Sequence, residues 1–96
     1  MKPSEALQKN RVMIRQIVAQ NHGSNPRVFG SVIHGDDTDT SDLDLLIDLT
    51  PKTTLLDIGR IQNHLQKLLG ITVDVLTPKA LPERFRLQVL AEAINV

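Results

Sequence analysis

The first 21 residues predict one amphipathic helix over positions 4–21. Charged and amide side chains separate the apolar ones, and the pair His22-Gly23 stands where a helix can end. The apolar side chains that share one side of this helix are Leu7, Ile14, Ile17 and Val18.

Three later segments predict short strands. Positions 27–29 are too few for a useful helix and follow the turn-forming sequence at 24–26. Positions 42–49 alternate in the manner of a strand, and positions 71–77 are β-branched between Gly70 and Pro78. The apolar side chains expected on one face of the second strand are Leu43, Leu45, Ile47 and Leu49.

Two further helices are predicted in the second half of the chain. Thr54 and Asp57 have the spacing of a capping box, which places a helix start there, and Gly70 stands where a helix-ending glycine belongs. Positions 81–94 predict the last helix. The apolar stripe of the first of these helices consists of Ile58, Ile61, Leu65, Leu68 and Leu69, and that of the second of Leu81, Phe85, Leu90 and Ile94.

The order helix, strand, strand, helix, strand, helix indicates an α/β (α+β) fold of two layers, a small mixed sheet with helices on one face and the other face open. A chain of 96 residues with 41% hydrophobic content can bury one modest core, so we expect a single domain over residues 1–96.

Composition narrows the classes of partner. Equal numbers of basic and acidic residues, 11 each, give no global field, and Phe29 and Phe85 are the only aromatic residues, so nucleic-acid binding is disfavoured. Cysteine is absent, and neither a signal peptide nor an apolar run that could span a membrane is present. We therefore expect a cytoplasmic protein with no membrane contact.

Three acidic residues are the candidates for chemistry. Side chains alternate along a strand, so Asp42 and Asp44 face away from Leu43, with Cα atoms about 6.6 Å apart. Two carboxylates so placed can bind one hard cation or bridge two, and Mg²⁺ is the natural occupant. Asp74 interrupts the apolar third strand, where burial without a partner would be costly, so we expect it on the same open face as a third metal ligand and as the group that deprotonates an acceptor hydroxyl.

The turn after the first strand adds a candidate phosphate site. At Gly30 the backbone can approach a phosphate closely, and Ser31 offers an N–H group and a hydroxyl. The loop that follows carries Asp36, Asp37 and Asp39, which we interpret as solvated turn residues.

Together these residues resemble a known family. The stretch GSVIHGDDTDTSDLD at positions 30–44 is similar to the signature of the polymerase-β-like nucleotidyltransferases: glycine-serine, ten residues, then Asp-x-Asp. The resemblance implies a polymerase-β palm-like fold, triphosphate binding by Gly30 and Ser31, metal binding by Asp42 and Asp44, and a third catalytic carboxylate at Asp74. His34 stands where relatives often carry arginine.

The short chain resembles the minimal, MNT-type members of this family, without the helical domains that larger relatives append. Such members are similar to the antitoxins of HEPN/MNT toxin–antitoxin pairs, which implies ATP as donor, a HEPN ribonuclease toxin as partner in a hetero-oligomer, and transfer of AMP to a tyrosine of that toxin. Two alternatives remain open: an antitoxin that neutralises its toxin by binding alone, and a nucleotidyltransferase whose acceptor is an RNA end or a small hydroxylated molecule.

Overall fold

The computed structural model describes all residues from 1 to 96. The helices are α1 (Pro3–Lys9), α2 (Arg11–Gln20), α3 (Ser31–His34), α4 (Leu55–Leu69) and α5 (Glu83–Glu92), with a short 3-10 helix η1 (Pro78–Ala80). The strands are β1 (Gly23–Phe29), β2 (Leu43–Leu49), β3 (Val73–Leu76) and β4 (Ile94–Asn95). No helix is both long and apolar enough to cross a membrane.

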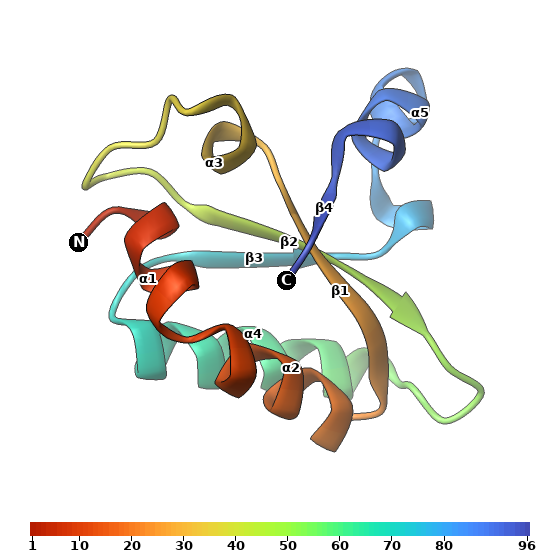
Figure 1. Cartoon of the computed structure of the whole chain (residues 1–96). Coiled ribbons are helices and arrows are strands. Elements are labelled where there is room, and N and C mark those ends of the chain that lie inside the picture. The colour runs from red at the N-terminus through yellow and green to blue at the C-terminus, as the bar shows by residue number, and fades with distance from the viewer.

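The strands form one mixed sheet in the order β3-β2-β1-β4. β2 and β3 run parallel, whereas β1 is antiparallel to both β2 and β4. Helices α1, α2 and α4 cover one face, and α3 and α5 lie on the opposite side (Figure 1). The predicted small mixed α+β sheet is confirmed, and its second face carries only the short α3 and a helix α5 that has no buried residue.

The core lies between the sheet and the covering helices. Leu43, Leu45 and Ile47 are completely buried, as the alternation predicted, because their side of β2 faces α2 and α4. Leu49 was expected on the same face but is 54% exposed, since the strand ends there. Leu46, on the other side of β2, is also fully buried.

The predicted first helix is in fact two helices. At Asn10 the backbone leaves the helical region, with φ −129° and ψ 21°. The Asn10 side chain donates to the carbonyl oxygen of Ala6 at 2.9 Å, so its amide replaces the continuing helical hydrogen bond. The apolar spacing continues across this break, which is why periodicity alone did not reveal it.

Strand β1 begins earlier than predicted. The polar segment that was expected to be a turn pairs with β2, with Ser24 opposite Asp48 and Arg27 opposite Leu46. One extra residue on β1 therefore forms a bulge, and Asn25 takes a positive φ of 49° within it. The bulge accommodates turn-type residues without ending the strand.

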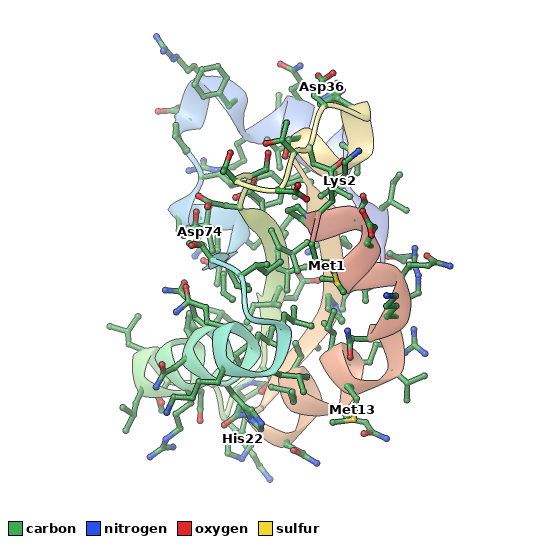
Figure 2. The ribbon with its side chains drawn as sticks, turned by 90° about the vertical axis from the view of Figure 1, so that its left-hand side faces the viewer. Met1, Lys2, Met13, His22, Asp36 and Asp74 are labelled. Atoms are coloured by element: carbon green, nitrogen blue, oxygen red, sulfur yellow. The ribbon has the colours of Figure 1, made fainter.

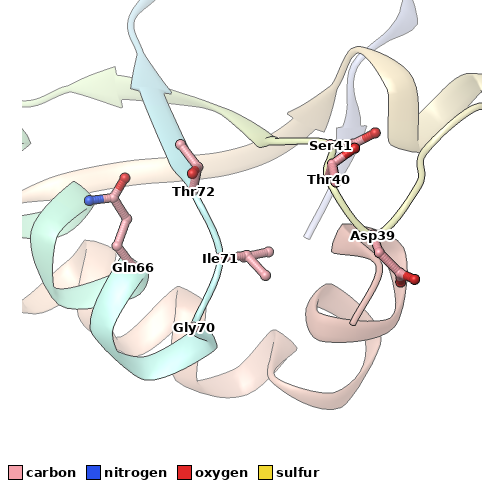
Figure 3. A pocket seen from close by; sticks show the side chains of 7 residues that line it. All are labelled: Asp39, Thr40, Ser41, Gln66, Gly70, Ile71 and Thr72. Carbon is pink, nitrogen blue, oxygen red and sulfur yellow. The ribbon is translucent and has the colours of Figure 1, made fainter.

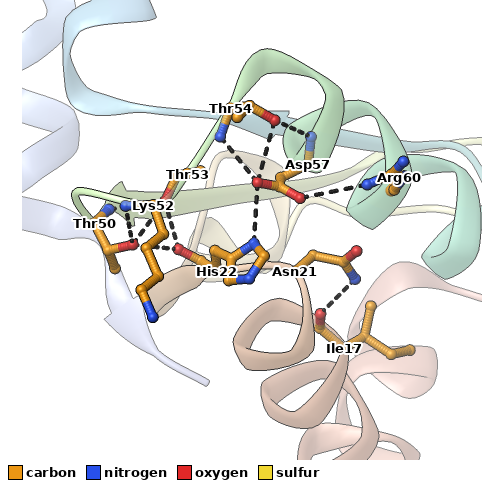
Figure 4. A network of polar contacts seen from close by, with 9 residues as sticks. All are labelled: Ile17, Asn21, His22, Thr50, Lys52, Thr53, Thr54, Asp57 and Arg60. Carbon is orange, nitrogen blue, oxygen red and sulfur yellow. Dashed lines mark hydrogen bonds and ion pairs between the residues drawn. The ribbon is translucent and has the colours of Figure 1, made fainter.

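Helix α4 begins and ends as predicted. Thr54 and Asp57 form a reciprocal capping box, and Gly70 takes the left-handed conformation that ends the helix. Leu68 is 41% exposed and lies outside the buried stripe. The buried Asp57 also contacts His22 Nδ1 at 3.2 Å, which ties the start of α4 to the turn after α2 (Figure 4).

The predicted helix over 81–94 is shorter than expected. Leu81 is buried before the helix starts, Pro82 occupies the N-cap position, and Ala93 leaves the helical conformation. The chain then forms β4, where Ile94 pairs with Val28 and Asn95 with Arg27. This edge strand was missed because two residues carry no readable alternation.

Candidate functional site

The predicted carboxylates meet where β2 and β3 begin. Asp44 and Asp74 are direct partners in the parallel pairing of β2 with β3, and Asp42 immediately precedes β2. Because Leu43 and Leu45 are buried against the helices, Asp44 lies on the opposite face of the sheet. Figure 2 shows Asp74 at the level of the sheet, between Asp36 at one end of the molecule and His22 at the other.

Asp44 is in an environment that disfavours its charge. Burial, together with the negative charges of Asp74 and Asp42, raises the pKa of the Asp44 carboxyl to about 6. Hydrogen-bond donors are not among the causes of this shift. The site thus concentrates negative charge that a cation or a proton would neutralise.

Gly30 is held directly against this carboxylate. It follows Phe29, which pairs with Asp44 across β1 and β2, and its φ of +80° is a conformation that other residues rarely adopt. A methyl group at Gly30 would overlap the Asp44 carboxylate. The glycine is therefore required both by the backbone conformation and by the space available.

The glycine-serine turn and Asp44 come from separate parts of the chain but lie in contact. Gly30 ends β1 and is the N-cap of α3, Ser31 is the first residue of α3, and Asp44 lies beside them on β2. Gly30 also lines a cavity, so the turn borders space as well as the carboxylate.

The residues fit a cation that arrives together with a substrate. No group of three or more His, Cys, Asp or Glu side chains is arranged as a metal site, so the predicted three-carboxylate ligand set is not preformed. Mg²⁺ in nucleotide-dependent sites is commonly held by one or two carboxylates together with phosphate oxygens. The charge repulsion at Asp44 is the feature that such a cation would relieve. Asp42, Asp44 and Asp74 as metal ligands stay a prediction.

One loop residue has a different role from the one predicted. Asp37 is buried rather than solvated, and its carboxylate accepts a hydrogen bond of 2.9 Å from the backbone N–H of Ser4. This bond lowers the pKa of Asp37 and satisfies a free N–H at the start of α1, where no side-chain cap is present. Asp36 and Asp39 are exposed, as expected.

Two cavities lie near these residues. A largely polar cavity of about 490 Å³ lies between the loop before β2, with Asp39 and Ser41, and the segment around Gln66 and Thr72 (Figure 3). A second cavity of about 390 Å³ contains Gly30 and is lined on its far side by α5.

The side chains from α5 were not recognised as site residues in the sequence. Glu92 Oε2 lies 3.3 Å from His34 Nε2, which brings the end of α5 to the helix that follows Gly30. The only signal in the sequence was the position of His34 shortly after the glycine-serine pair, and no local pattern pointed to its contact 58 positions away.

Comparisons with known proteins agree with this geometry. Residues 12–96 match the family described as polymerase beta, nucleotidyltransferase. A candidate protein adenylyltransferase of Methanocaldococcus jannaschii is 35% identical over 69 residues, which cover 72% of this chain and 74% of that protein. Protein adenylyltransferase MntA of Thermococcus cleftensis is 33% identical over 69 residues, covering 72% of this chain and 70% of MntA.

Solved structures extend the likeness to the fold. A candidate minimal nucleotidyltransferase is 40% identical, with a TM-score of 0.85 over 97% of this chain and 95% of that one. A complex of the tri-AMPylated HEPN toxin of Shewanella oneidensis with its MNT antitoxin contains a chain that matches with a TM-score of 0.67. That chain is 17% identical, over 92% of this chain and 69% of the other, so it shows the fold alone. The family match over residues 12–96 and the close minimal relative show that this chain is an enzyme of the polymerase-β-type nucleotidyltransferase family, of the minimal kind.

Proposed function

We propose that this enzyme is an antitoxin. With Mg²⁺ bound, it transfers AMP from ATP to the hydroxyl group of a tyrosine in a cognate HEPN ribonuclease toxin. The observation that carries the proposal is the contact of Gly30 with Asp44 beside Asp74, which joins a phosphate-binding turn to a cluster of carboxylates. Nucleotidyl transfer needs these two elements within reach of one α-phosphate.

Each residue has a defined part in this reaction. Gly30 lets its backbone approach the triphosphate, and Ser31 donates from its N–H and hydroxyl groups. Asp42 and Asp44 would hold Mg²⁺, which would neutralise charge on the phosphate oxygens. Asp74 accepts the proton of the acceptor hydroxyl. The hydroxyl oxygen forms a bond to the α-phosphorus, the bond from that phosphorus to the bridging oxygen breaks, and pyrophosphate leaves.

The acceptor and the partner are inferred from the relatives. Two relatives above 30% identity are named as a protein adenylyltransferase or a candidate for one, and the fold is shared with an antitoxin in complex with an AMPylated HEPN toxin. The proposed product is therefore an AMP-modified toxin in a hetero-oligomer with this chain.

Two alternatives predict different results. An antitoxin that acts by binding alone would protect against the toxin even without its carboxylates. A transferase acting on an RNA end or a small hydroxylated molecule would label that acceptor instead. The net charge of zero and the 2% aromatic content disfavour RNA.

The test is transfer of label from α-labelled ATP, with Mg²⁺, to the cognate HEPN protein. We compare wild type with the double variant Asp42→Asn and Asp44→Asn, and with Asp36→Asn as a control in the exposed loop. Label on the toxin with wild type and the control, and none with the double variant, would support the proposal. No label with any form, while all of them still inhibit the toxin, would leave an antitoxin that acts by binding.

A further inference from the structure

The only two aromatic residues of the chain line the same cavity. Phe29 and Phe85 are 56 positions apart, yet both border the space of about 390 Å³ that also contains Gly30. In a chain with no tyrosine or tryptophan, this cavity is the one place where a flat ring could stack on an aromatic side chain.

The cavity is continuous with the phosphate turn. Phe29 is the last residue of β1 and immediately precedes Gly30, and it pairs with Asp44 on β2. A ring beside Phe29 would therefore lie one residue from the turn at which we place the triphosphate. The opposite wall consists of apolar side chains from η1 and α5, among them Leu81, Phe85 and Val89.

Polar contacts at both ends hold this wall in position. Arg86 donates to the carbonyl oxygens of Pro78 at 2.8 Å, Lys79 at 3.2 Å and Leu81 at 3.0 Å, which attaches the start of α5 to η1. At the other end, Glu92 contacts His34. The helix buries no residue of its own. Phe85 is 44% exposed and lines the cavity, and the Arg84 guanidinium lies over one face of its ring, 4.7 Å from the ring centroid.

The polar groups in the cavity can recognise an exocyclic amine. Besides His34, the polar side chains are Gln88 and Glu92, and Gln88 donates to Glu92 Oε1 at 3.3 Å. An ionised carboxylate only accepts hydrogen bonds, and each of its oxygens has a second acceptor site. It can therefore accept a hydrogen bond from the exocyclic amine of a base such as adenine.

We propose that this cavity binds the nucleobase of the donor, with Phe85 as the stacking surface and Glu92 as the acceptor for the exocyclic amine of the base. The inference rests on the proposed function, because it assumes that Gly30 and Ser31 hold the triphosphate.

The first experiment measures binding by calorimetry with Mg²⁺ and no acceptor. The probes are α,β-methylene ATP, which cannot be cleaved at the reacting bond, and inorganic tripolyphosphate, which has no base. Phe85→Ala should weaken the nucleotide about tenfold and leave tripolyphosphate unchanged. Leu87→Ala removes an 82% exposed side chain that lies outside the cavity on the same helix, and it should change neither affinity.

The second experiment measures base selection. Wild type should bind α,β-methylene ATP about tenfold more tightly than its counterpart with an unsubstituted purine base, which lacks the exocyclic amine. Glu92→Gln, whose neutral amide oxygen accepts a hydrogen bond more weakly than a carboxylate, should reduce this preference. Glu83→Gln makes the same chemical change on the exposed start of α5 and should preserve it.

The outcomes separate the two hypotheses. If the nucleotide binds but Phe85→Ala has no effect, or Glu92→Gln keeps the base preference, the base site is wrong and the proposed transferase function stands. If wild type binds neither tripolyphosphate nor the nucleotide, both are overturned. If the base site is confirmed but no AMP reaches a toxin, only the proposed acceptor fails.

Discussion

Asp57 is buried and Asp44 is half-buried, and their surroundings shift their pKa values in opposite directions. At Asp57, the backbone N–H of Thr54 is the largest cause of a lowered pKa, and hydrogen bonds from His22 and the Thr54 hydroxyl act in the same direction. At Asp44, burial and two acidic neighbours raise the pKa to about 6. One carboxylate is stabilised by donors, and the other lacks them.

The difference separates a structural carboxylate from a functional one. Asp57 belongs to a network that fastens α4 to the turn after α2, where Thr50 and Thr53 also donate to the His22 carbonyl (Figure 4). Asp44 has unsatisfied charge on the face where Gly30 and Asp74 also lie. A carboxylate pKa that is perturbed by burial and by like charges is typical of sites that bind ligands. The bound ligand or cation neutralises the charge that the protein leaves uncompensated.

The largest expected effect is a loss of activity when the surroundings of Asp44 are changed. Gly30→Ala should reduce nucleotide transfer at least ~100-fold, because its methyl group would displace the Asp44 carboxylate. Gly35→Ala is the matched control: Gly35 also has a positive φ, of 73°, but an added Cβ there meets no atom within 4 Å. Equal losses of labelling in the two variants would mean that backbone strain, and not the contact with Asp44, explains the effect.

Removing the Asp57 carboxylate should lower the thermal stability of the protein and leave nucleotide transfer unchanged. Asp57→Ala breaks the capping box and the contact with His22, so the Tm should fall by several degrees, as followed by circular dichroism. Asp36→Ala, in the exposed loop, should leave the Tm unchanged. Unaltered thermal stability of Asp57→Ala would show that this network does not hold the fold together.

Asp44→Asn should have the opposite effect on stability. A folded-state pKa above the unfolded value of 3.8 means that stability decreases as the pH rises from about 4 to above 6, where Asp44 becomes charged. In metal-free buffer at about pH 7.5, the variant should be more stable than wild type by about 1 kcal/mol, a value reduced for solvent screening of a half-buried group. The gain should disappear near pH 4, and urea denaturation at the two pH values measures it.

The smallest effect is expected from acid titration of Asp57. Its folded pKa lies below 3.8, so the stability it contributes is complete above that pH and is lost as the pH falls through the folded pKa. The Tm of wild type should therefore fall more steeply below pH 3.8 than that of Asp57→Asn. Parallel curves for the two proteins would argue against a lowered pKa.

Only part of the difference between Asp44 and Asp57 could be predicted from the sequence. The capping box at Thr54 and Asp57 is a local pattern, and the structure contains it as predicted. The contact of Asp57 with His22 joins positions 35 apart and had no local signal. Likewise, the spacing from Gly30-Ser31 to Asp42 and Asp44 identified the family, but the close approach of Gly30 to Asp44 depends on how β1 pairs with β2.

The sequence by itself determined the features that a few neighbouring residues control: the alternation of β2, both ends of α4, and the motif that names the family. Tertiary structure alone decided the break at Asn10, the burial of Asp37, the edge strand β4 and the position of α5 over the second cavity. The physical reason is the distance along the chain over which each interaction acts. Caps and periodicity act within a few residues, whereas burial, strand pairing and the pKa of Asp44 depend on neighbours that only the folded chain brings together.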